Sequence, residues 1–144
     1  MAKVQFSILS KNVIVDKKTN QLSIINILEE AQFTADPLPQ PNEWTLFPLE
    51  LQLVTMFIRS DPEVPEHTEA RIRVSAPSGE IFTTSVKFPV SLTESRFNRN
   101  ITRFSQTPIF STGQHDYIID LLDDNGEWNE AFRAPVFLTL TELE

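Results

Sequence analysis

IFSTGQHDYIIDLLDDNGEW, residues 109–128, carries the strongest structural signal in the chain. It contains the only tyrosine, Tyr117, and two of the three glycines. Asn125-Gly126 follows an apolar run, and these two residue types tolerate the positive φ angles of a type I′ hairpin turn. Residues 117–122 form a short run that contains β-branched residues and is bounded by polar ones, which is typical of a buried strand. The stretch therefore predicts a β-hairpin.

The residues that lead into this strand are similar to the tyrosine corner of immunoglobulin-like sandwiches. In that motif a Tyr hydroxyl bonds to backbone close by in the sequence, so we expect Tyr117 to do the same. The order Gly113, Gln114, His115, Asp116 departs from the motif at two places. The motif would have a glycine where His115 stands and an acidic residue where Gly113 stands.

Alternating apolar and polar residues predict further strands with one buried face. They cover residues 4–8, 13–15, 22–28, 45–59, 70–76, 82–88, 101–110 and 134–141. Residues 12–28 are expected to form a hairpin, and Gly79 in Pro77–Glu80 predicts a type I turn with a bulge or a type II turn. No helical period is long enough for a parallel crossover. The sequence predicts one domain over residues 1–144, an all-β antiparallel two-sheet β-sandwich of immunoglobulin-like type with eight or nine strands.

Proline and polar residues mark the expected connections. Residues 29–43, with Pro37, Pro39 and Pro41, predict an extended crossover between sheets. Residues 60–68 are expected to form a loop. Residues 89–100 are expected to form a second, basic loop with one helical turn at 91–96. Pro48 is expected near the start of its strand or on a sheet edge.

Composition narrows the function classes. The chain has 144 residues and no cysteine, which excludes thiol catalysis, disulfides and Cys-ligated zinc. No apolar run of signal-peptide length precedes Lys11, and no window approaches a membrane span, so we expect a cytoplasmic protein. The net charge of −8 argues against nucleic acid or an anionic membrane as the main partner. Three glycines cannot build a phosphate loop, so no cofactor is expected.

The charge is uneven along the chain. From Asp116 to the end there are eight acids against Arg133 alone, whereas residues 87–103 carry four bases against Glu94. A solvated loop is the more common explanation of such a basic stretch. It also offers Arg96, Arg99 and Arg103 to acidic groups of a partner or of a second copy.

Two histidines are weak catalytic candidates. His115 beside Asp116 invites a base-and-orienter interpretation, and a hydrolase would need His115 to face a hydroxyl or carboxylate. Neighbours on a strand point to opposite faces, however, and no Gly-x-Ser-x-Gly nucleophile motif exists. His67 lies among Glu66 and Glu69, where a metal site is conceivable, but one His with flexible carboxylates is more often solvated.

Acids and tryptophans leave two ligand classes open. Asp120, Asp123, Asp124 and Asn125 resemble a calcium loop but fail its spacing, because alignment on Gly126 places Leu121 at the first ligand position. Sandwich domains also hold calcium with acids from several loops. Trp44 and Trp128 each stand beside acids, as in sugar-binding platforms, although Trp more often covers a core.

A resemblance covers nearly the whole chain. Residues 13–28, the strand that ends in Ala76–Gly79, and the spacing of Gly113 and Tyr117 resemble a family of short bacterial and phage-associated proteins of unknown function. This resemblance implies an immunoglobulin-like sandwich and carries no activity or site.

These observations favour a non-enzymatic module that acts by protein–protein contact or as a piece of an assembly. The residues expected to bind the partner are Arg96, Arg99, Arg103 and Trp44. The alternatives are a carbohydrate- or calcium-binding module, which needs Trp44 or the acids on one exposed patch, and a hydrolase that uses His115.

Overall fold

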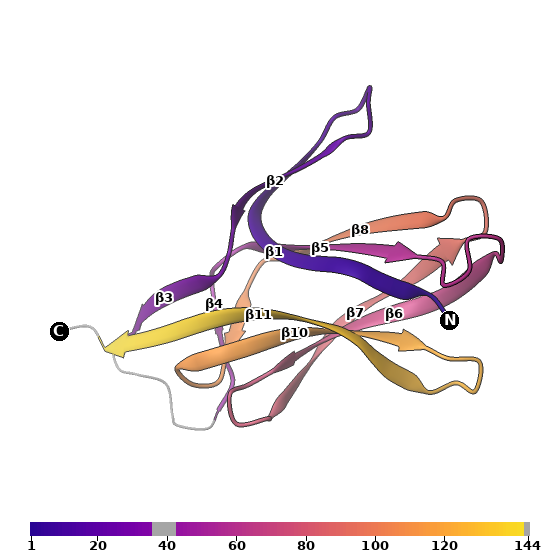
Figure 1. Cartoon of the computed structure of the whole chain (residues 1–144). Helices are drawn as coiled ribbons and strands as arrows, with labels where there is room; N and C mark the ends of the chain where they lie inside the picture. Colours follow the sequence, from indigo (N-terminus) through magenta and orange to yellow (C-terminus); the bar gives the residue numbers. More distant parts are fainter. Residues whose placement is uncertain (36–42, 143–144) are drawn as a thin grey trace.

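The computed structural model describes residues 1–35 and 43–142 of the chain. These residues form eleven β-strands and no helix, which confirms the all-β prediction (Figure 1). Eleven strands are two or three more than the expected eight or nine. The predicted strands over residues 45–59 and 101–110 are each divided in two, and part of the predicted connector is itself a strand, whereas the two N-terminal runs join into one.

Four strands form the first sheet in the order β2-β1-β5-β8, and all pairs are antiparallel. The strands are β1 (Lys3–Val15), β2 (Leu22–Ile27), β5 (Leu51–Ile58) and β8 (Phe97–Phe104). The predicted hairpin over residues 12–28 is confirmed, since β1 and β2 pair from Ser10↔Ile27 to Val15↔Leu22. The two N-terminal runs are one continuous strand.

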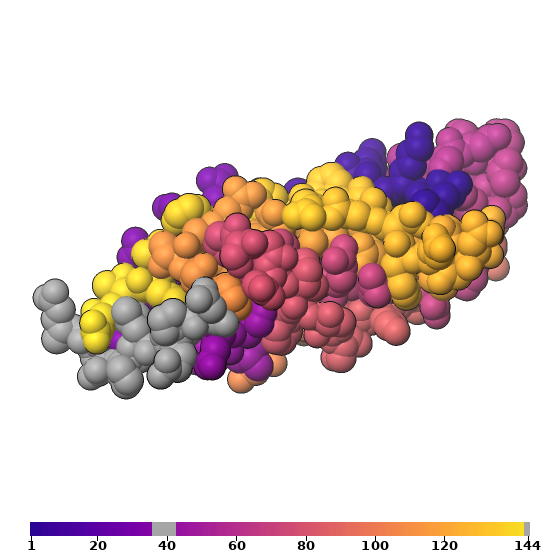
Figure 2. All heavy atoms as spheres, turned by 90° about the horizontal axis from the view of Figure 1, so that it is seen from below, coloured from indigo at the N-terminus to yellow at the C-terminus, as the bar shows by residue number. Residues whose placement is uncertain are grey.

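Five strands form the second sheet in the order β3-β11-β10-β6-β7. They are β3 (Glu30–Ala35), β11 (Trp128–Glu142), β10 (Gly113–Leu122), β6 (Glu66–Ser75) and β7 (Ile81–Leu92). Figure 2 shows one face of this sheet, with β10 and β11 in orange and yellow beside β6 and β7 in pink, along an elongated molecule. A small third sheet pairs β4 (Thr45–Phe47) with β9 (Thr107–Ile109).

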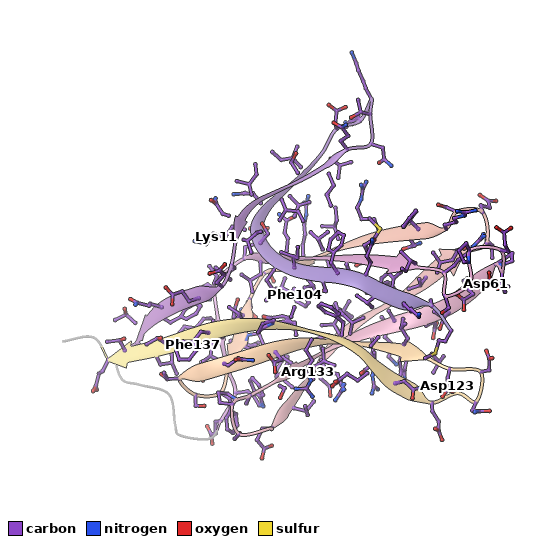
Figure 3. All side chains as sticks on the ribbon, viewed as in Figure 1. Lys11, Asp61, Phe104, Asp123, Arg133 and Phe137 are labelled. Atoms are coloured by element: carbon purple, nitrogen blue, oxygen red, sulfur yellow. The ribbon has the colours of Figure 1, made fainter. Side chains whose placement is uncertain are left out.

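The two larger sheets enclose one apolar core. Alternate residues of β5, β6 and β10 point inward and are fully buried, among them Leu53, Ile72 and Ile119. Phe104 lies between the layers (Figure 3). The alternation predicted for residues 70–76 and 82–88 is confirmed by the burial of every second residue in β6 from Ala70 to Val74 and by the alternating exposure along β7. β6 and β7 pair antiparallel.

Several predicted boundaries are wrong. The chain crosses between the large sheets near Leu28, and residues 30–35 form β3, which pairs parallel with β11. The sandwich is thus not purely antiparallel. The three prolines of the expected connector lie outside the described residues. Pro48 divides the apolar run 45–59 into β4 and β5, because proline cannot donate to a strand ladder.

The two expected surface loops are shorter than predicted. Residues 66–68 belong to β6, and residues 89–92 and 97–100 belong to β7 and β8, so only residues 93–96 remain as a loop and no helical turn forms there. Pro89 is accommodated because β7 is an edge strand. The basic stretch is therefore strand rather than solvated loop.

Both predicted hairpin turns exist and share one construction. In each, a backbone bond closes a four-residue turn, Gly126 N–H to Asp123 O at 3.1 Å and Gly79 N–H to Ala76 O at 2.9 Å. Each glycine has positive φ, +79° and +94° respectively. Asn125 is not in the positive-φ region. The hairpin between β10 and β11 therefore has a type I turn with a glycine bulge at Gly126, and the type I′ prediction for Asn125-Gly126 is wrong.

Candidate functional site

The three arginines expected to bind a partner lie on or just before β8, but they are not equivalent. The Arg96 side chain is 60% exposed, and its Nη2 lies 3.5 Å from a carboxylate oxygen of Glu63, which is 84% exposed. Arg99 donates hydrogen bonds to the carbonyl O of Asn20 at 3.2 Å and to its Oδ1 at 2.8 Å. Arg103 is exposed and has no ion pair among the described residues. Arg96 and Arg103 are therefore the accessible members.

Strand β8 is the outer strand of its sheet. All eight of its residues pair with β5, from Leu51↔Phe104 to Ile58↔Phe97, and its other side has no strand beside it within the described residues. Residues 97, 99, 101 and 103 alternate with the core-facing set, so Arg99 and Arg103 share the outer face. Phe97 is on the same face and is 53% exposed. The edge thus combines free backbone groups, positive charge and an aromatic ring.

A groove of about 310 Å³ lies where the edge strands β7 and β8 border the space between the two sheets. Its apolar lining comes from both layers, and its polar lining comes from β7, from the end of β8 and from the residues between β8 and β9. The apolar residues are Leu46, Val74, Phe82, Val86, Phe104 and Pro108. Arg103, Thr83, Ser85 and Gln106 are among the polar ones. The groove could accept one apolar side chain with a charged neighbour.

Tyr117 contributes to the lining of this groove and is fully buried. Its hydroxyl has no hydrogen-bond partner among the described residues, so the predicted tyrosine corner is wrong. Thr107 lies nearby, but its hydroxyl donates to the Leu49 carbonyl at 2.9 Å. Burial raises the pKa of Tyr117 far above its usual value, and Thr107 opposes this effect only weakly. The ring is instead packed edge-on against Phe104, with centroids 5.5 Å apart.

Trp44 does not join the arginines of β8. It is half-buried and packs among three rings, with centroid distances of 5.3 Å to Phe82, 5.2 Å to Phe110 and 6.0 Å to His115. Trp44 therefore covers the end of the core near β4, which is the more common role of tryptophan. A sugar platform needs the ring face open, and here neighbouring rings occupy the space around it.

His115 is fully buried and both ring nitrogens bond to backbone. Nε2 accepts from the Phe110 N–H at 3.1 Å, and Nδ1 lies 3.1 Å from the Gly113 carbonyl, so the ring carries its proton on Nδ1. Burial lowers the pKa of His115. Asp116 points to the opposite face, where it accepts from Arg133 at 3.3 Å. His115 thus faces neither a hydroxyl nor a carboxylate.

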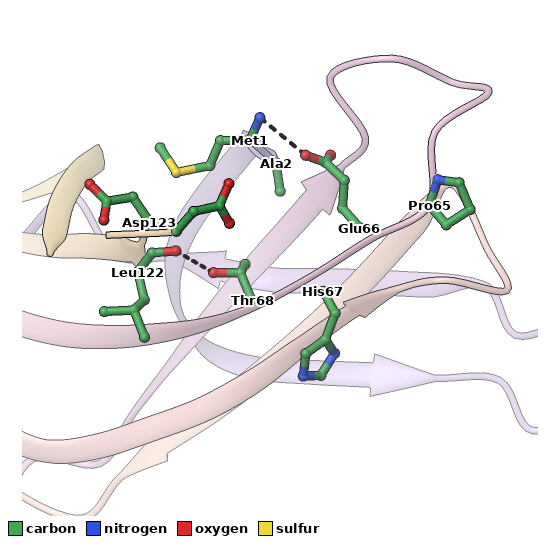
Figure 4. Close-up of a pocket in the computed structure, with 9 residues that line it drawn as sticks. Met1, Ala2, Pro65, Glu66, His67, Thr68, Leu122 and Asp123 are labelled. Atoms are coloured by element: carbon green, nitrogen blue, oxygen red, sulfur yellow. Dashed lines mark hydrogen bonds and ion pairs between the residues drawn. The ribbon is translucent and has the colours of Figure 1, made fainter. Parts of the chain in front are cut away.

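A second cavity, of about 320 Å³, lies at the end of the molecule that holds the N-terminus. The Met1 amino group is 3.1 Å from Glu66, and Thr68 donates to the Leu122 carbonyl at 2.6 Å (Figure 4). Figure 4 shows the His67 side chain pointing away from Glu66. His67 and Glu66 therefore do not converge on a common ion.

Asp123 lines the same cavity, but its carboxylate serves the turn. Oδ1 accepts from the N–H groups of Asn125 and Glu127, both at 2.9 Å, and Oδ2 accepts from the Asn129 amide at 2.8 Å. The Glu127 backbone bond and the Asn129 amide lower the pKa of Asp123. Within residues 1–35 and 43–142, no three His, Asp or Glu side chains are grouped to hold a metal.

A charge cluster that no local sequence pattern predicts lies on the outer face of the five-stranded sheet. Asp120 is 1% exposed and accepts from Arg71 Nε at 2.8 Å and from both Nε and Nη2 of Arg73. Burial alone would raise the pKa of Asp120, but the bonds from Arg73 and Arg71 outweigh burial and lower it. Arg71 also lies 4.7 Å from the ring centre of Trp128, so a cation covers this tryptophan.

Comparisons with protein-family models and with curated proteins find no match for the chain. No helix of the described residues is long and apolar enough to cross a lipid bilayer. The candidate functional site is therefore defined by geometry alone. It consists of the β8 edge with Arg96, Phe97 and Arg103, together with the adjoining groove.

Proposed function

We propose that the chain is an immunoglobulin-like, non-enzymatic recognition module that binds an extended acidic segment of a protein partner along β8. The observation that carries the proposal is the unpaired outer edge of β8 with Arg103 exposed beside the groove. The resemblance to short bacterial and phage-associated sandwich proteins suggests no activity for the chain, so the proposal rests on this surface.

Backbone groups of β8 supply the affinity in this proposal. An extended peptide beside an edge strand adds main-chain hydrogen bonds, and pockets for alternate side chains supply specificity. β8 has a regular register with β5 over all eight residues and no bulge that would turn its edge away. Exposed edges are often protected by charge, and the charge here is positive, which selects acidic segments.

Arg103 and the groove supply the specificity. The guanidinium of Arg103 has no carboxylate partner among the described residues, so an incoming Asp or Glu would not compete with an internal ion pair. Alternate residues of an added strand point to one side. One such residue, if apolar, would lie over Val86 and Phe104 in the groove while its neighbours face Arg103.

The test maps where an acidic extended peptide binds. A peptide of four Val-Glu repeats is titrated into ¹⁵N-labelled protein, and amide shifts are followed by NMR. We expect the shifts to concentrate on β8 and on residues 82–86 of β7, and to need about tenfold more peptide, or more, in Arg103→Glu. Lys3→Glu is the matched control, because it makes the same charge change on an exposed residue of β1. Shifts confined to the cavity at Met1, or none at all, would refute the proposal.

A further inference from the structure

The β1–β2 hairpin stands away from the body of the sandwich (Figure 1). β1 pairs with β5 only as far as Ser10↔Gln52, and beyond that point β1 and β2 pair with each other. Beyond Ser10 the hairpin is therefore a two-stranded arm, and the hydrogen bonds of Arg99 to Asn20 join its tip to β8. Two-stranded ribbons are only marginally stable unless one face is covered.

One face of the arm carries exposed isoleucines. Ile14 is 55% exposed, Ile25 is 42% exposed and Ile27 is 56% exposed. Asn12 pairs with Ile25, and cross-strand partners lie on the same side of a ladder, so Ile14 and Ile25 share that side. Val13 and Ile24, which pair on the opposite side, are half-buried. Three large aliphatic side chains open to water on a projecting arm mark a contact surface.

Charge differs between the two ends of the arm. At the tip, Lys17 and Lys18 are exposed, and Asp16 uses one carboxylate oxygen to accept from the Lys18 and Thr19 N–H groups. The two lysines against this one acid leave the tip positive. Just beyond Ile27, at the base, two exposed glutamates outnumber one lysine; these residues are Glu29, Glu30 and Lys11.

We propose that this arm is a self-association surface, on which the hairpins of two copies pack face to face and antiparallel. A two-fold axis brings the same patch of both copies together. The antiparallel arrangement then places each tip, with Lys17 and Lys18, beside the Glu29 and Glu30 of the other copy. A parallel arrangement would instead oppose like charges. The isoleucines lie between these charged ends and supply the apolar contact.

The size of the arm sets the strength of this contact. One face of a short hairpin falls below the roughly 1,000 Å² of total buried area that stable interfaces exceed. The dimer is therefore weak, and it dissociates on dilution. The contact is independent of the proposed recognition site, because Arg103 and the groove take no part in it.

Analytical ultracentrifugation of the full chain over a concentration series tests the proposal. We expect wild type to dimerise reversibly, and Lys17→Glu with Lys18→Glu to weaken the dimer by about tenfold or more. Glu29→Lys with Glu30→Lys should do the same. Circular dichroism and melting curves check that both variants fold. Arg103→Glu is the charge-changing control and should leave the dimer intact.

An equimolar mixture of the two double variants gives the decisive result. In the mixture the negatively charged tip of one variant meets the positively charged arm base of the other. The positively charged tip of the second variant likewise meets the negatively charged arm base of the first, so dimerisation should return to the wild-type level. Wild type that stays monomeric at every concentration, or a mixture no more dimeric than its components, would overturn the proposal.

Discussion

Arg99 of β8 and Asn20 at the tip of the β1–β2 hairpin are joined by two hydrogen bonds, although they lie 79 residues apart in the sequence. The bonds tie the projecting arm to the strand that carries the candidate recognition site. Asn20 has φ of +58°, a left-handed conformation that Asn tolerates better than most residues. Arg99 is therefore a structural link and not a free cation for a partner.

Replacing Arg99 with Ala should release the tip of the arm. Because the pair is exposed, the free energy of unfolding should fall by less than about 1 kcal/mol. Hydrogen exchange of the amides in residues 16–21 should become faster, while exchange in β5 stays unchanged. Arg103→Ala serves as control, since Arg103 has no bond to the arm. Equal exchange in both variants would show that the link does not hold the tip.

Gly126 should be far more sensitive to substitution than Asn125, its neighbour in the turn. Gly126→Val should destabilise the domain by on the order of 1 kcal/mol or more, because a β-branched residue is strained at positive φ. Gly79→Val should behave alike, since both turns have the same construction. Asn125→Ala should have little effect, whereas a type I′ turn would penalise it. Urea unfolding of the three variants measures these differences.

Asp120 should support stability at neutral pH and lose that effect in acid. Its pKa is lower folded than unfolded, so the contribution is present above the unfolded pKa of about 3.9 and disappears as pH falls through the folded pKa. Asp120→Asn should cost on the order of 2 kcal/mol near neutrality, because it leaves Arg71 and Arg73 with a neutral partner. The gap between variant and wild type should narrow near pH 3 in urea unfolding. A gap independent of pH would contradict this role.

His115 should give a separate pH dependence at higher pH. Burial lowers its pKa in the folded state, so folding excludes a proton that the unfolded chain accepts below about pH 6.5. Stability should therefore fall as pH drops from about 7.5 to about 5. In His115→Gln this slope should flatten, although the variant is less stable at neutral pH. Melting temperatures measured across this range check the difference.

Local patterns predicted the paired strands well and the divisions between them poorly. The alternation in β6 and the glycine at position 79 are local features, and both were found as expected. Asn26, near the end of β2, has a φ of +58°, and the chain then passes to β3 in the other sheet, a change that no local pattern in the sequence predicts. The parallel pairing of β3 with β11 joins chain segments that are distant in sequence.

The candidate site was predicted only in part for the same reason. The basic stretch was visible in the sequence, but its placement on a strand edge depends on sheet order. Arg99 finds Asn20, and Arg73 finds Asp120 47 residues away, through tertiary structure alone. Trp44 was grouped with the arginines because composition cannot show that Phe82 and Phe110 pack around it.

The affinity of the acidic Val-Glu peptide for wild type and for Arg103→Glu, measured by isothermal titration calorimetry at low and at high salt, tests the proposed function most directly. The proposed function predicts binding that weakens as salt rises and falls by about tenfold or more in Arg103→Glu, while Lys3→Glu binds like wild type. Equal affinity in all three proteins, or affinity indifferent to salt, would contradict it.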